Sequence, residues 1–330
     1  MKDIMGLFAE ATEKVSEGTT AVVKKSNELL QTSQEAVCGI LDQDGDGQID
    51  SVDIILMALK IPGVRIDRES FLRKEFYKNH PKEVIDKIID STPALAGITA
   101  DEVDKIADEV ITYERNAVSG ISVALGMPGG PAMAATIPAD IAQYYGYMLR
   151  AAQKLLYLYG FPQIITSSSD VKLDTETINS LTVCLGVMNG VATANYFIKG
   201  MSKALATGVE KKLIHTALTK GAVYPIVKSV AKWFGVKMTK EVFAGFFKKS
   251  IPVLGGMIGG GLTYVSFKPC CYRLKDSLKD TLLSNPEKHI ETKGEQQIFE
   301  EIKKGVIYDL DPKDVCIIDE AVNEKMSIQQ

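Results

Sequence analysis

Residues 42–53 read Asp-Gln-Asp-Gly-Asp-Gly-Gln-Ile-Asp-Ser-Val-Asp. Asp42, Asp44 and Asp46 alternate along this stretch, so their carboxylates can converge on one side of a loop. Gly47 follows at a sharp turn, where glycine adopts a positive φ without strain. Apolar residues precede the loop, and they recur at helical spacing after it, at Val52, Ile55, Leu56 and Leu59. The stretch therefore predicts a helix–loop–helix unit.

The oxygen donors of this loop suit Ca²⁺, which takes about six to eight oxygen ligands. The predicted ligands are Asp42, Asp44, Asp46, the backbone carbonyl of Gln48, Asp50 through a water molecule, and Asp53. This is the ligand spacing of an EF-hand calcium loop. Such a loop usually ends with Glu, and Asp53 is one methylene shorter. We therefore expect weaker calcium binding or a greater tolerance of Mg²⁺.

Residues 61–72 read Ile-Pro-Gly-Val-Arg-Ile-Asp-Arg-Glu-Ser-Phe-Leu and resemble the remnant of a second EF-hand loop. They lack the three acidic positions, so no ion is expected there. Ile66 is predicted to pair with Ile49 in a short strand, and Asp67 to cap a helix over 68–77. A further helix is expected over 81–90. Residues 1–78 then form an N-terminal unit with one functional and one degenerate loop.

Three long segments without charged residues follow, at 117–139, 177–198 and 250–267. Each is near the length that spans a bilayer, and small residues such as Gly255 and Gly259 allow close helix packing. Membrane insertion and burial in a soluble core both remain open for them. The predicted fold class is all-α, a multi-helix bundle with Gly-rich buried helical hairpins, preceded by an EF-hand helical module.

A narrow polar stripe marks the helix predicted over 138–159. Its members recur at steps of three and four residues, at Asp140, Gln143, Tyr147, Arg150 and Lys154. The stripe is either the solvent side of a buried helix or the lining of a groove. Asp140, Tyr147 and Arg150 are the candidate residues if the protein is an enzyme, although the sequence has no nucleophile elbow, zinc motif or phosphate loop.

The stretch Lys199–Lys249 is rich in Lys, contains no Arg and has only two acidic residues, Glu210 and Glu241. Aromatic residues are interleaved with the lysines, which favours contact with an anionic membrane surface. A solvated face over an apolar core is the alternative.

The net charge and the cysteine content bear on the binding partner and on the cellular compartment. The formal net charge of −4 argues against nucleic-acid binding. The five cysteines have no CxxC spacing, which suits a reducing compartment. A cytoplasmic protein with peripheral membrane association is expected.

Two short motif groups carry a family resemblance. The segment 109–160 contains Gly126-Met127-Pro128-Gly129-Gly130 and Ile137-Pro138-Ala139-Asp140, and a second group is the Gly-rich run 251–261. These motifs resemble the EcsC family over about residues 100–283. The resemblance implies an α-helical domain, here residues 79–283, and supplies no catalytic residues. An EF-hand before such a domain departs from the usual family pattern. Residues 284–330 are expected to form a polar, partly mobile tail.

These observations predict a calcium-binding, non-enzymatic helical interaction protein, whose ion site either senses calcium or staples the N-terminal unit to the rest. Its further partner is a protein of unspecified kind or an anionic membrane. One alternative is a membrane-inserting effector that uses the two Gly-rich apolar segments, 117–139 and 250–267. The other is an enzyme that uses the polar stripe of the helix predicted over 138–159.

Overall fold

The computed structural model describes residue 42 and residues 51–126, 133–165, 174–221, 225–230 and 254–305. Every regular element in these ranges is an α-helix, which confirms the all-α fold class. The helices are α2 (Ser51–Leu59), α3 (Arg68–Phe76), α4 (Lys82–Asp90), α5 (Ala100–Gly126), α6 (Met133–Leu158), α7 (Thr175–Met188), α8 (Ala192–Ala206), α9 (Lys211–Thr219), α11 (Leu254–Lys279) and α12 (Lys293–Lys304).

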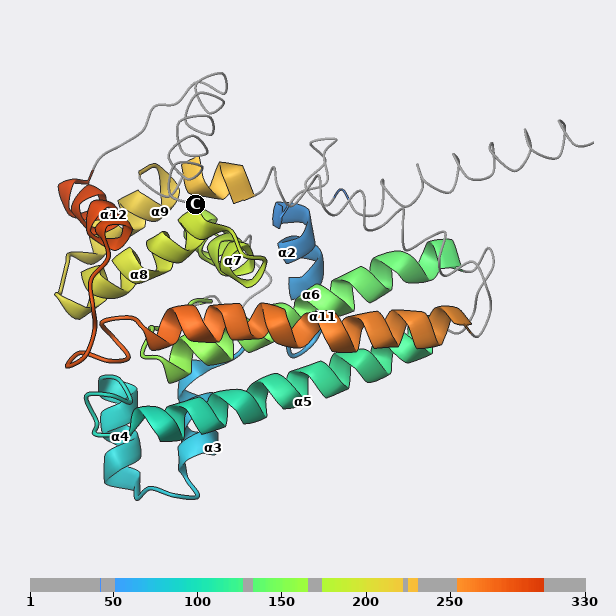
Figure 1. Ribbon diagram of the computed structural model, residues 1–330, viewed down its shortest axis with the longest axis horizontal. Coiled ribbons are helices and arrows are strands. Elements are labelled where there is room, and N and C mark those ends of the chain that lie inside the picture. The colour runs from blue at the N-terminus through green and yellow to red at the C-terminus, as the bar shows by residue number, and fades with distance from the viewer. Residues whose placement is uncertain are drawn as a thin grey trace, which may run out of the picture.

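Three long helices, α5, α6 and α11, pack against one another along the length of the molecule (Figure 1). Thr263 of α11 donates a hydrogen bond to Ser122 of α5 over 3.2 Å between their hydroxyl oxygens. The ring of Tyr144 on α6 meets Phe267 of α11 edge-on. The described parts of the segments 117–139 and 250–267 therefore belong to helices that pack on each other. Within the described ranges, no helix has both the length and the apolar character needed to cross a membrane.

Helix α11 runs through Pro269. A proline inside a helix removes one backbone hydrogen bond, here the bond to the carbonyl of Val265. Val265 is 70% exposed, so water can reach this side of the helix and the missing bond costs less than it would in the core.

Helix α12 lies within residues 284–330, which the sequence predicts to be a polar, partly mobile tail, and it is a regular α-helix. Thr292 and Glu295 form a complete capping box at its start, and Gly305 ends it with a φ of 62°. Phe299 and Ile302 are buried, and the helix packs against α8 and α9. The pattern Thr292-x-x-Glu295 in the sequence is the signal for this helix start.

The contact between α8 and α12 depends on a glycine. A Cβ atom added at Gly200 would lie 2.7 Å from Cγ2 of Ile298 and 3.2 Å from the carbonyl oxygen of Glu295. Since the second neighbour is backbone, it cannot rotate away. Gly200 therefore lets the two helices approach closely.

We expect Gly200→Ala to lower the free energy of unfolding by about 1 to 2 kcal/mol, because the new methyl group pushes α12 away from α8. The matched control is Gly120→Ala in α5, where an added Cβ meets nothing within 4 Å. This control should be neutral or stabilising by up to about 1 kcal/mol, since alanine favours helix. Urea unfolding of both variants measures the difference, and equal stabilities would contradict the close packing at Gly200.

Candidate functional site

Helix α2, which begins inside the predicted calcium loop, is part of the core. Ile54, Ile55 and Ala58 are fully buried, and the helix packs against α6 and α7. The hydroxyl oxygens of Ser51 and Thr182 lie 3.3 Å apart in this buried contact. The exit helix of the loop is thus fixed to the bundle.

Two of the six predicted ligands fall on described residues. Asp53 lies in the first turn of α2 and is 1% exposed, and Asp42 is half-buried. The other four, Asp44, Asp46, Gln48 and Asp50, lie outside the described residues. Position 12 of an EF-hand loop belongs to the first turn of the exit helix, which is where Asp53 lies.

The backbone after α2 is held by polar side chains of α6. Gln153 is fully buried; its Nε2 donates to the carbonyl of Val64 over 2.9 Å, and its Oε1 accepts from the N–H of Ile66 over 3.1 Å. Arg150 donates from Nη1 to the carbonyl of Gly63. The hydroxyl of Tyr157 donates to the carbonyl of Ile66 over 3.3 Å.

The predicted pairing of Ile66 with Ile49 involves a residue outside the described ranges, since Ile49 is not among them. The N–H of Ile66 donates to Gln153. Helix α2 packs on α6 and α7, and α3 packs on α4 and α6. Asp67 does cap α3 as predicted, since its side chain accepts from the N–H of Ser70 over 2.8 Å.

The polar stripe of α6 leads to a buried carboxylate that sequence reasoning missed. Glu114 of α5 is 0% exposed; Arg150 Nε lies 3.0 Å from its Oε2, and Lys154 Nζ lies 2.6 Å from its Oε1. The Arg150 guanidinium also lies 5.3 Å from the ring centre of Tyr147. The Asp140 side chain lies outside the described residues. At Arg150 and Lys154 the stripe is therefore neither a solvated face nor an open groove, but half of an ion-pair centre within the bundle.

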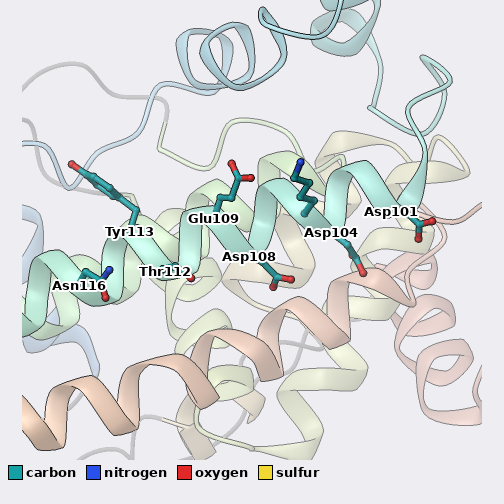
Figure 2. Close-up of a pocket in the computed structure, with 8 residues that line it drawn as sticks. Asp101, Asp104, Asp108, Glu109, Thr112, Tyr113 and Asn116 are labelled. Atoms are coloured by element: carbon teal, nitrogen blue, oxygen red, sulfur yellow. The ribbon is translucent and has the colours of Figure 1, made fainter.

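A second group of charges lies along α5, in a shallow surface depression (Figure 2). Figure 2 shows Asp104 and Asp108 directed toward α11, with Glu109 and Tyr113 extending from the opposite side of α5. Asp104 pairs with Lys279 over 2.5 Å, and Asp108 pairs with Lys275 over 2.7 Å. These pairs join α5 to α11. Across the described ranges, no group of three or more His, Cys, Asp or Glu side chains is placed to hold a metal ion.

The described cysteines are free thiols, and two of them are deeply buried. Burial raises the pKa of Cys184 to about 12 and raises the pKa of Cys271 as well. Both therefore remain protonated at neutral pH and are poor nucleophiles.

Comparisons of the chain with protein-family models, with curated proteins and with solved structures found no match. The resemblances to the EcsC family and to an EF-hand accordingly stay predictions.

We expect Glu114→Gln to lower the free energy of unfolding by about 3 kcal/mol, because two cations then face each other without a compensating charge. This is the lower end of the range for a broken buried pair, since the side chains of Arg150 and Lys154 keep 20% and 12% exposure. Glu109→Gln, on the exposed side of the same helix, is the control and should stay near wild type. Equal free energies of unfolding for the two variants in chemical denaturation would contradict a stabilising role for the ion pairs of Glu114.

Alkaline pH should loosen the attachment of residues 61–67. Burial raises the pKa of Tyr157 from 10.0 to about 12. Its contribution to stability is therefore full below about pH 10, and it is lost as pH rises toward 12, because the unfolded chain loses this proton first. Tyr157→Phe should cost about 1 kcal/mol at neutral pH and flatten the decline between pH 10 and 12. The exposed Tyr77→Phe is the control; an identical pH profile for both variants would contradict the assignment.

Proposed function

We propose that the chain is a calcium-binding, non-enzymatic helical interaction protein in which residues 42–53 hold the ion and α2 joins that loop to the core. One observation carries the proposal: Asp53, the last predicted ligand, lies buried in the first turn of a helix that packs on α6 and α7. The donor set consists of carboxylate and carbonyl oxygens, which suit Ca²⁺ and Mg²⁺.

The packing of α2 favours a stapling role over a sensing role. A sensor EF-hand swings its helices apart when calcium binds. Moving α2 would expose Ile54 and Ile55, each worth about 1.5 to 3 kcal/mol of burial. It would also pull on the backbone that Arg150 and Gln153 hold. Ion binding at the loop would therefore add stability to one fixed arrangement.

A peripheral contact with an anionic surface, through Lys199–Lys249, is the second part of the proposal. Lys199 and Lys203 form ion pairs with Asp280 and Glu291. Lys211 and Lys212 at the start of α9 and Lys220 at its C-cap are exposed, and the residues from 231 to 249 lie outside the described ranges. The membrane-inserting alternative receives less support, because the described part of 250–267 packs against α5 and α6.

Calcium is expected to stabilise the full-length protein against urea, by about 2.7 kcal/mol when the free ion is a hundred times its dissociation constant. Magnesium should have a smaller effect of the same sign. The double variant Asp44→Asn with Asp46→Asn should lose both effects, whereas Asp90→Asn, an exposed acid outside the loop, should keep them. Calorimetric titration that finds no calcium binding to the wild type would refute the proposal.

Hydrogen exchange separates a staple from a sensor. For a staple, the amides of α2 stay protected in chelator and gain protection with calcium. Loss of protection across α2 and residues 61–67 on calcium addition would instead assign a sensor.

A further inference from the structure

A cavity of about 460 Å³ lies between α7, α8, α9 and the residues that follow α6. Its inner wall consists of apolar side chains that are almost entirely removed from solvent, among them Val183, Phe197, Ile198, Ile214 and Leu218. The volume is within the range of about 300 to 1,000 Å³ that small-molecule sites occupy. An apolar lining of this size favours an apolar guest.

The edge of this cavity is charged. Glu176 contributes from α7, and Lys211, Lys212 and His215 contribute from α9. Nδ1 of His215 lies 2.6 Å from the carboxylate of Glu176, so these two groups satisfy each other. Lys211 and Lys212 are exposed, and neither forms an ion pair within the part of the chain that the structure describes. Beside the Glu176–His215 pair, the two ammonium groups of Lys211 and Lys212 make this edge positively charged.

We infer that this cavity binds a single-chain amphiphile with one anionic head group, such as a long-chain carboxylate. The apolar wall takes the chain, and Lys211 and Lys212 meet the head group at the edge. The match is one of charge as well as apolar lining, because the ammonium groups of Lys211 and Lys212 at the edge complement a carboxylate. The inference stands apart from the calcium loop, since none of the lining residues belongs to 42–53 or to α2.

The site holds its ligand without covalent chemistry. Cys184 lines the cavity, but burial raises its pKa to about 12, so at neutral pH the thiol carries its proton. Binding and release are therefore the expected events, and acyl transfer to this thiol is not.

The test is calorimetric titration of the full-length protein with octanoate, dodecanoate, hexadecanoate and dodecan-1-ol, each below its aggregation concentration. Affinity should rise about fourfold for each added methylene until the cavity is full. Dodecanoate should bind more tightly than dodecan-1-ol, by about five- to tenfold, because only the carboxylate meets the lysines. Absence of saturable binding would overturn the inference, and so would equal affinity for the acid and the alcohol.

Two variants locate the ligand. Ser180→Phe places a ring in the cavity from its half-buried wall on α7 and should abolish dodecanoate binding. Lys211→Gln with Lys212→Gln should weaken dodecanoate about five- to tenfold and leave dodecan-1-ol unchanged. Lys220→Gln, at the other end of α9 and outside the cavity lining, is the matched control. The lysine variants change only exposed side chains, so they remain decisive even if Ser180→Phe unfolds; wild-type affinity in the double lysine variant would refute the head-group contact.

Discussion

The carboxylate of Glu114 is the charge around which the long helices are arranged. It is fully buried, and an unpaired charge there would cost several kcal/mol. Arg150 and Lys154 meet this need from one side of α6, four residues apart. Arg150 also donates to the carbonyl of Gly63, so one guanidinium ties together α5, α6 and the backbone after α2. That pairing fixes α5, α6 and the backbone at Gly63 relative to one another.

The same short part of α6 fixes residues 63–66 through three side chains. Arg150, Gln153 and Tyr157 donate to carbonyls of this segment, and Gln153 also accepts from the N–H of Ile66. Steps of three and four residues put these groups on one side of the helix. The segment that follows α2 is therefore held in one arrangement, and this is the physical basis for proposing that an ion at residues 42–53 would act as a staple.

Packing is uneven at the other end of the molecule. Helices α8 and α12 approach so closely that only glycine fits at position 200. Helices α7, α8 and α9 leave a cavity of about 460 Å³ between them, with apolar side chains in its wall and charged ones at its edge. Space in an otherwise dense interior costs dispersion energy, and an apolar guest would recover it. The ion loop and the cavity therefore call for separate experiments.

Local order could be predicted from the sequence, because its causes lie within a few residues. Helical periodicity predicted the bounds of α3 and α4 to within one residue, and Asp67 was predicted as the cap of α3. The spacing of the acidic residues in Asp42–Asp53 predicts a set of oxygen ligands for calcium. Only the tertiary structure could decide that Ile66 bonds to Gln153, 87 residues away, and that Arg150 pairs with Glu114, 36 residues away. A polar side chain on a helix surface can bond to many different partners, so its position in the sequence does not determine which residue it bonds to. That choice is made by which helices pack together, and burial then requires each charge and each N–H to be paired.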